Sequence, residues 1–174
     1  MFVQAKPHTP ERIVGRLGAY FDPERTGMMD LGYRELRQCS CTDCRDEYGW
    51  TDETNLIPEL MSEAHNVRCN ERTRVSLSYK GQFVVSAKRI RSLRRKIYEG
   101  LESKLVGEDR ILLGQEEDSP DSPVFGYALE RSWGVLFQCA DLTAVRDECP
   151  GLTVPGIAMG DLRRARPEDC GCLD

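Results

Sequence analysis

The sequence predicts a single α/β domain with few strands and two prominent helices, and three observations lead to this expectation. The chain has 174 residues, which is the length of one ordinary domain. Hydrophobic residues make up 40% of it and charged residues 30%, a composition typical of globular proteins. Short segments with the alternation of strands are interleaved with longer segments in which apolar residues recur at helical spacing.

Two segments show the strongest helical periodicity. In residues 87–105, which follow Ser86 as a candidate N-cap, one apolar stripe is formed by Ile90, Leu93, Ile97, Leu101 and Leu105. A second helix is expected over residues 124–137, with one side made of Phe125, Leu129, Trp133 and Phe137. Because Trp133 shares its face with large apolar neighbours, we expect it to pack in the core rather than to bind a ligand.

The strand predictions are shorter. Residues 74–79 alternate between polar and apolar side chains, and a strand resumes at residues 82–85. Between them, Lys80-Gly81 is a turn signal. Phe2-Val3 is expected to close one further short strand.

The rest of the chain is expected to be a short helix, loops and a tail. Thr9-Pro10-Glu11 reads as the start of a helix that reaches about Tyr20. We expect a turn-rich link at residues 26–33, a polar loop at 38–56, and a short helix opened by Pro58. Residues 139–174, rich in Gly, Pro and charge, are expected to form a weakly ordered tail.

Charge and hydropathy exclude several classes of protein. The net charge is −5, whereas a general nucleic-acid binder is normally basic. No run approaches the roughly 18 apolar residues that a membrane span needs. Residues 1–8 lack a basic segment followed by an apolar one, so no signal peptide is predicted and the chain as written is expected to be cytoplasmic.

Eight cysteines fit poorly with a cytoplasmic chain. In the cytosol free thiols are the default state, whereas an even number suits disulfides in a secreted protein. We therefore expect ancestry in the secretory pathway, of a Golgi-like kind. The spacing of Cys39, Cys41, Cys44 and Cys69 also allows a four-thiolate zinc site, to which Cys170 and Cys172 could add a pair. Disulfides, zinc and inert thiols all stay open on the residues alone.

A basic run lies in the first half of the expected 87–105 helix. It consists of Lys88, Arg89, Arg91, Arg94, Arg95 and Lys96. With Ser86 and the backbone N–H groups of the helix start, these side chains could bind a phosphate or another anion. The apolar stripe already occupies one face, so most of these charges are expected to point into solvent. No aromatic residues are interleaved with the run, which argues against single-stranded nucleic acid.

Three separated segments resemble one family. They are Phe2-Val3-Gln4-Ala5-Lys6-Pro7-His8, then Gly32-Tyr33-Arg34-Glu35-Leu36-Arg37, and finally Gly81 to Arg91 running into Lys96-Ile97-Tyr98-Glu99 and Tyr127 to Trp133. In order and spacing they are similar to the mainly fungal domain of unknown function 3431, whose pattern resembles glycosyltransferases of the GT-A fold. The resemblance covers residues 1–138.

The resemblance implies a partial GT-A-like, Rossmann-like domain that lacks the N-terminal nucleotide-binding units. The implied activity is transfer of a sugar from a nucleotide donor to a small-molecule or glycan hydroxyl, in modification of a fungal secondary metabolite or a glycan. Glu130 would be the catalytic base. Gln4, Lys6 and His8 would line the donor-side turn, and Ser86 and Arg89 would also bind substrate.

The same resemblance bears on metals and cysteines. A metal-dependent enzyme of this fold needs a carboxylate pair such as Asp-x-Asp for its divalent ion, and no Asp-x-Asp occurs in the chain. No cofactor is therefore evident, and a divalent metal is expected only with a donor site. The family likeness favours a disulfide loop over zinc. Two alternatives to an enzyme remain: a non-catalytic remnant or interaction protein of a biosynthetic gene cluster, and a small zinc-binding module.

Overall fold

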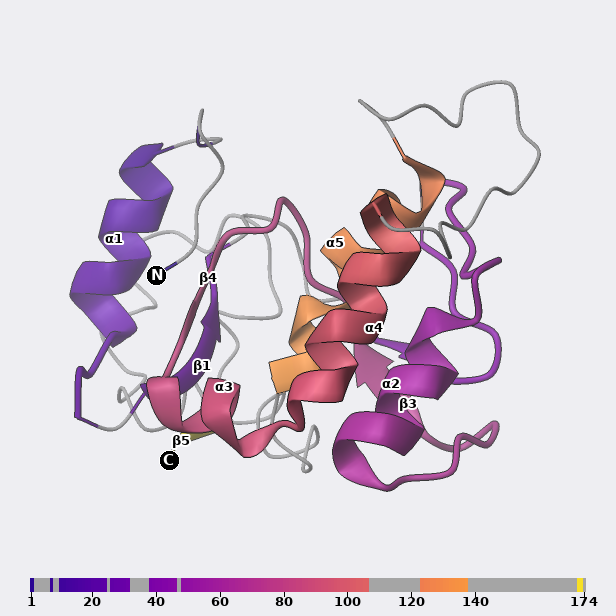
Figure 1. The fold of residues 1–174 in the computed structure, drawn as a ribbon. Helices are drawn as coiled ribbons and strands as arrows, with labels where there is room; N and C mark the ends of the chain where they lie inside the picture. The colour runs from indigo at the N-terminus through magenta and orange to yellow at the C-terminus, as the bar shows by residue number, and fades with distance from the viewer. Residues whose placement is uncertain are drawn as a thin grey trace.

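The computed structural model describes residues 1, 7, 10–24, 26–31, 38–46, 48–106, 123–137 and 172–173. This part of the chain mixes helices with short strands, as predicted (Figure 1). Its helices are α1 (Pro10–Tyr20), α2 (Leu56–His65), α3 (Ala87–Ser92), α4 (Arg95–Val106) and α5 (Val124–Phe137). Its strands are β1 (Thr26–Asp30), β2 (Gln38–Ser40), β3 (Arg74–Ser76), β4 (Phe83–Val85) and β5 (Cys172–Leu173).

Strand β1 is the centre of a three-stranded sheet in the order β4-β1-β5. Met29 faces Val84 across the β1–β4 pair, and all five residues of β1 are buried. The predicted turn-rich link is therefore wrong over residues 26–30. Glycine and aspartate are poor strand formers, so the local sequence does not predict this strand. It forms because distant segments pair with both its edges. One of those segments, β5, comes from the predicted tail, whose residues 139–171 lie outside the described part.

Strands β2 and β3 form a separate pair, with Cys39 opposite Val75. The predicted loop at 38–56 is thus partly a strand. Both sheets are antiparallel in every pair that the described residues form. Rossmann-like βα units pair their strands in parallel, so the described strands support a mixed helix-and-strand fold without reproducing that unit.

The helix predicted over residues 87–105 is in fact two helices. Leu93 is extended (φ −82°, ψ 145°) and ends α3, and α4 begins at Arg95. The Tyr98 hydroxyl donates a hydrogen bond of 2.9 Å to the Ile90 carbonyl at the end of α3. Arg94 turns away and donates to the Glu63 carbonyl at 3.0 Å. The apolar spacing continues across the break, so periodicity alone predicts no interruption.

Helix α5 is the element on which the rest of the described core converges. It spans Val124–Phe137, as predicted, and contacts α2, α4 and β3; in Figure 1 it lies behind α4. The Trp133 ring lies 5.3 Å from that of Phe83 and stacks at 6.1 Å on that of Phe137. The expected packing role of Trp133 is confirmed.

Candidate functional site

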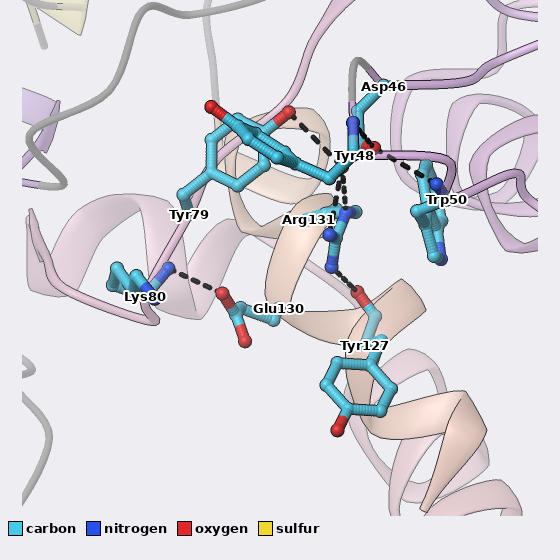
Figure 2. A network of polar contacts seen from close by, with 8 residues as sticks. All are labelled: Asp46, Tyr48, Trp50, Tyr79, Lys80, Tyr127, Glu130 and Arg131. Carbon is cyan, nitrogen blue, oxygen red and sulfur yellow. Dashed lines mark hydrogen bonds and ion pairs between the residues drawn. The ribbon is translucent and has the colours of Figure 1, made fainter.

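Glu130, the predicted catalytic base, lies half-buried in the middle of α5. Its Oε1 atom accepts a hydrogen bond of 2.7 Å from the backbone N–H of Lys80 (Figure 2). Lys80 and Gly81 both have left-handed backbones, with φ of 70° and 55°, which confirms the predicted turn. Few side chains tolerate that conformation. The carboxylate thus fastens a strained turn to α5 and is itself held in one orientation.

Ser78, two residues before that turn, is bound into the backbone of the same helix. Its hydroxyl donates to the Glu130 carbonyl at 2.8 Å and accepts from the Gly134 N–H at 3.1 Å. In a regular helix these two backbone groups bond to each other, because they are four residues apart. The Ser78 N–H also donates to the Arg131 carbonyl at 3.0 Å. The segment before the turn is thereby locked to the turn of α5 that carries Glu130.

The residue after Glu130 forms a buried ion pair. Arg131 donates from Nε to Asp46 Oδ2 at 2.9 Å, and its Nη2 lies 2.8 Å from the same oxygen. The Asp46 side chain is 0% exposed and that of Arg131 is 11% exposed. A third contact, from Nη1 to the Tyr127 carbonyl at 3.2 Å, holds the guanidinium along α5. Both charges are removed from water, so each depends on the other.

Asp46 also organises the loop that contains it. Its Oδ1 accepts the backbone N–H groups of Tyr48 at 2.8 Å and Trp50 at 3.0 Å. The Arg131 guanidinium lies 4.8 Å from the centre of the Trp50 ring and 5.4 Å from that of Tyr79 (Figure 2). Aromatic faces attract such a cation. Sequence reasoning missed this cluster, because no local pattern links two charges that are 85 residues apart.

Ser86 and Arg89 lie at a different place from Glu130. The Ser86 hydroxyl accepts the Arg89 N–H at 3.1 Å, so the predicted N-cap is confirmed. The Arg89 guanidinium donates to the Phe137 carbonyl at 2.9 Å, at the last residue of α5. Phe137 is seven residues beyond Glu130, about 10 Å along the helix axis. The structure therefore does not bring these two residues together with Glu130, and Gln4, Lys6 and His8 lie outside the described residues.

The four cysteines proposed as alternative zinc ligands are paired as disulfides. The bonds are Cys39–Cys44 and Cys41–Cys69, with Cα atoms 5.0 Å and 5.5 Å apart. Zinc binds thiolates, and oxidised sulfurs are not thiolates. Within the described ranges no group of three or more His, Cys, Asp or Glu side chains is arranged to hold a metal.

A polar hollow of about 240 Å³ lies beside these disulfides. Three carboxylates line it, and each has a partner inside the protein. Asp52 caps α2 by accepting the N–H groups of Leu56 and Ile57 at 3.1 Å and 2.8 Å. Asp43 pairs with Arg45, and Glu53 accepts from the Thr51 hydroxyl. The hollow is thus explained by loop structure and helix capping.

The basic run lies largely on the surface, as predicted. Arg94 and Lys96 share the Glu63 carboxylate, and Arg95 pairs with Glu99 one turn along α4. These three cationic side chains are 59–89% exposed. Exposed pairs of this kind contribute little stability.

Comparison of the chain with protein-family models, with curated proteins and with solved structures gave no match. The likeness to GT-A transferases consequently stays a proposal. None of the described helices has the length and hydropathy that a membrane span requires.

Proposed function

We propose that this chain is a glycosyltransferase-like protein in which Glu130 acts as the base toward an acceptor hydroxyl. The observation that carries the proposal is the fixed orientation of the Glu130 carboxylate, which the Lys80 N–H holds at 2.7 Å. A general base must be held within hydrogen-bond reach of the proton it removes. Tyr127, one turn earlier on the same helix and 47% exposed, offers an aromatic edge beside it.

The chemistry assigned to Glu130 is a single proton transfer. As the acceptor oxygen attacks the sugar carbon, the bond to the nucleotide diphosphate breaks, and the carboxylate takes the proton of the hydroxyl. The Oε1 atom stays on the Lys80 N–H, and Oε2 is the atom available to the acceptor. By the family likeness, Gln4, Lys6 and His8 line the donor side. The sequence contains no Asp-x-Asp pair, and the proposal assigns no step to a metal.

A second candidate function is a non-catalytic remnant or interaction protein, and one observation favours it. Each described residue of the proposed substrate site makes a hydrogen bond that stabilises the fold. Glu130 binds the Lys80 turn, Ser86 caps α3, and Arg89 caps the end of α5. A protein kept only for a partner would need these contacts without any sugar chemistry.

The experiment that separates the two uses the purified oxidised chain with nucleotide sugars and Mn²⁺. Donor binding would raise the melting temperature, because a ligand that binds only the folded state stabilises it. The Glu130→Gln variant keeps an oxygen for the Lys80 N–H but cannot act as a base. We expect transfer or donor hydrolysis to fall about 10²-fold or more, and an unchanged rate would exclude Glu130 as the base. Glu99→Gln, an exposed acid on α4, is the matched control. If no donor shifts the melting temperature and no turnover is detected, the non-catalytic function is favoured.

We also propose that the chain folds in an oxidising compartment. Two disulfides among the described residues are typical of secretory-pathway proteins and rare in the cytosol. Thiol counting by alkylation and mass spectrometry, after expression in the cytosol and in the periplasm of the same bacterium, tests this. Equal yield of fully reduced, folded protein from the cytosol would contradict it.

A further inference from the structure

The loop that carries Asp46 is held in place by the two disulfides. Cys44 lies two residues before Asp46 and is bonded to Cys39 of β2, while Cys41 is bonded to Cys69, which follows α2. The Asp52 N–H donates to the Cys44 carbonyl at 3.0 Å and closes the loop behind Asp46. The position of Asp46 against Arg131 therefore depends on covalent bonds as well as on the ion pair.

The four cysteine residues differ in their exposure to solvent. Cys41, Cys44 and Cys39 are 1%, 3% and 6% exposed, whereas Cys69 is half-buried. Cys41 and Cys44 line the same polar hollow. A thiolate attacks only a sulfur that it can reach, so an external thiol meets this cluster first at Cys69.

We propose that Cys69 is a thiol-exchange site through which a dithiol reductant releases the Asp46–Arg131 pair and loosens α5 around Glu130. The inference rests on the described contacts and not on glycosyl transfer, so it stands or falls separately from the proposed function.

The exchange balances in three steps. A thiolate of the dithiol attacks Cys69 Sγ, the bond to Cys41 breaks, and Cys41 leaves with the electron pair as a thiolate. The second thiol of the reductant then displaces Cys69, so the dithiol becomes a cyclic disulfide and two electrons reach the protein. The Cys41 thiolate next attacks Cys44 and displaces Cys39, forming a Cys41–Cys44 bond. Cys44 is then no longer bonded to β2, and the chain that leads to Asp46 is released from that strand.

The consequence reaches α5 through Arg131. Without Asp46, the guanidinium would be a buried charge whose remaining contacts among the described residues are the Tyr127 carbonyl and the Trp50 and Tyr79 rings, which is a costly state. Arg131 is expected to swing toward water. Glu130 and the Arg131 carbonyl, which bind the Lys80 turn and Ser78, belong to the same helical turn and would lose their fixed position.

The first test follows the order of reduction. Limiting dithiothreitol, quenching with an alkylating agent and peptide mapping should show Cys69 labelled in the earliest products, together with Cys41 before the internal exchange or with Cys39 after it. In the Cys41→Ser/Cys69→Ser double variant the remaining buried bond should be reduced about tenfold more slowly than in the natural chain. Equal rates, or early products in which Cys69 is not labelled, would overturn the entry site.

The second test measures coupling by hydrogen exchange in oxidised and reduced protein, with α4 as the internal reference. Reduction should speed exchange in residues 124–137 about tenfold or more, with α4 changed far less. In the oxidised Asp46→Asn variant, hydrogen exchange in α5 should already be fast. Reduction should then accelerate it little further, because both changes remove the same interaction. Asp43→Asn, in the same loop but exposed and paired with Arg45, should behave as the natural chain. Equal loosening of α4 and α5, or an additive effect in Asp46→Asn, would overturn the proposal. If that variant does not fold, the comparison of α4 with α5 in the natural chain decides alone.

Discussion

Two regions of this protein place charged side chains in opposite surroundings. In the first, Asp46 and Arg131 are enclosed between a loop and α5, with 0% and 11% of their side chains exposed. In the second, along α4, Arg95 and Glu99 form an ion pair of similar length, 2.7 Å, with 89% and 56% exposed. The distances are nearly equal and the surroundings are not.

The difference shows that burial, more than distance, determines what an ion pair does. In water the attraction at α4 is screened, and either partner is solvated well without the other. In the interior, removal of one partner leaves a charge with no solvation. The number of charges in a segment is therefore a poor guide: the basic run holds six cations, and the single Arg131 has the larger structural role.

The largest difference between the two regions is expected when Asp46 is replaced. Asp46→Ala should lower the free energy of unfolding by about 3–5 kcal/mol, because it leaves Arg131 buried without its counter-ion. Asp43→Ala, which removes an exposed acid from the same loop, should cost about 1 kcal/mol or less. Urea denaturation of the oxidised proteins measures both, and similar costs for the two variants would remove the distinction between the regions.

Ser78 provides the next largest effect. Ser78→Ala should cost about 1–3 kcal/mol, because its hydroxyl satisfies two backbone groups of α5, at Glu130 and Gly134, that are then left without this partner. Ser92→Ala is the control, since that exposed hydroxyl bonds only to the Arg89 carbonyl one turn back, and a change within about 0.5 kcal/mol is expected. A larger loss at Ser92 than at Ser78 would contradict this ranking.

The expected effect of replacing Tyr98 is intermediate in size, and the stability contribution of this residue depends on pH. Burial raises the pKa of the Tyr98 phenol above its ordinary value, so the folded state keeps this proton to higher pH than the unfolded state. The contribution is fully present below about pH 10 and is lost as pH rises through the folded pKa. Tyr98→Phe should cost about 0.5–1.5 kcal/mol at pH 7, through the lost bond to the Ile90 carbonyl. The difference from the natural chain should shrink in urea titrations above pH 10; a constant difference would argue against the raised pKa.

The smallest effect is expected on α4. Glu99→Gln removes the exposed partner of Arg95 and should change stability by about 0.5 kcal/mol or less. The change should vanish in 1 M salt, where surface charges are screened over about 3 Å. A loss comparable with that of Asp46→Ala would mean that exposure does not separate the two regions.

The sequence predicts best the parts of the fold that are locally determined. Helices α1 and α5 and the Ser86 cap match their predictions, because periodicity and capping chemistry act over a few residues. The break at Leu93 was not predictable in this way: it is accompanied by contacts of the residues after it, since Tyr98 binds back to the Ile90 carbonyl of α3 and Arg94 binds the Glu63 carbonyl of α2. Strand β1 was missed for the same reason, since its pairing partners lie more than 50 residues away at Val85 and more than 140 away at Leu173.

The candidate site shows the same division. Glu130 was singled out through family likeness, and the Lys80–Gly81 turn through its residue types. Nothing in either segment indicates that one caps the other. Asp46 and Arg131 were not predicted at all, because a loop aspartate and a helix arginine are usually solvated and their burial depends on the complete fold.

The way α5 is completed bears on how the chain folds. Its backbone and side chains are bound by Ser78, His65, Arg89 and Asp46, across separations of 52, 70, 48 and 85 residues. Non-local contacts of this kind form slowly, because the entropy of closing long loops is lost before any contact is gained. Helix α5 is thus expected to acquire its native structure late, after α2 and β2–β3 have come together. Most of its contacts would then be absent from the folding transition state, and mutations in α5 would act mainly by accelerating unfolding.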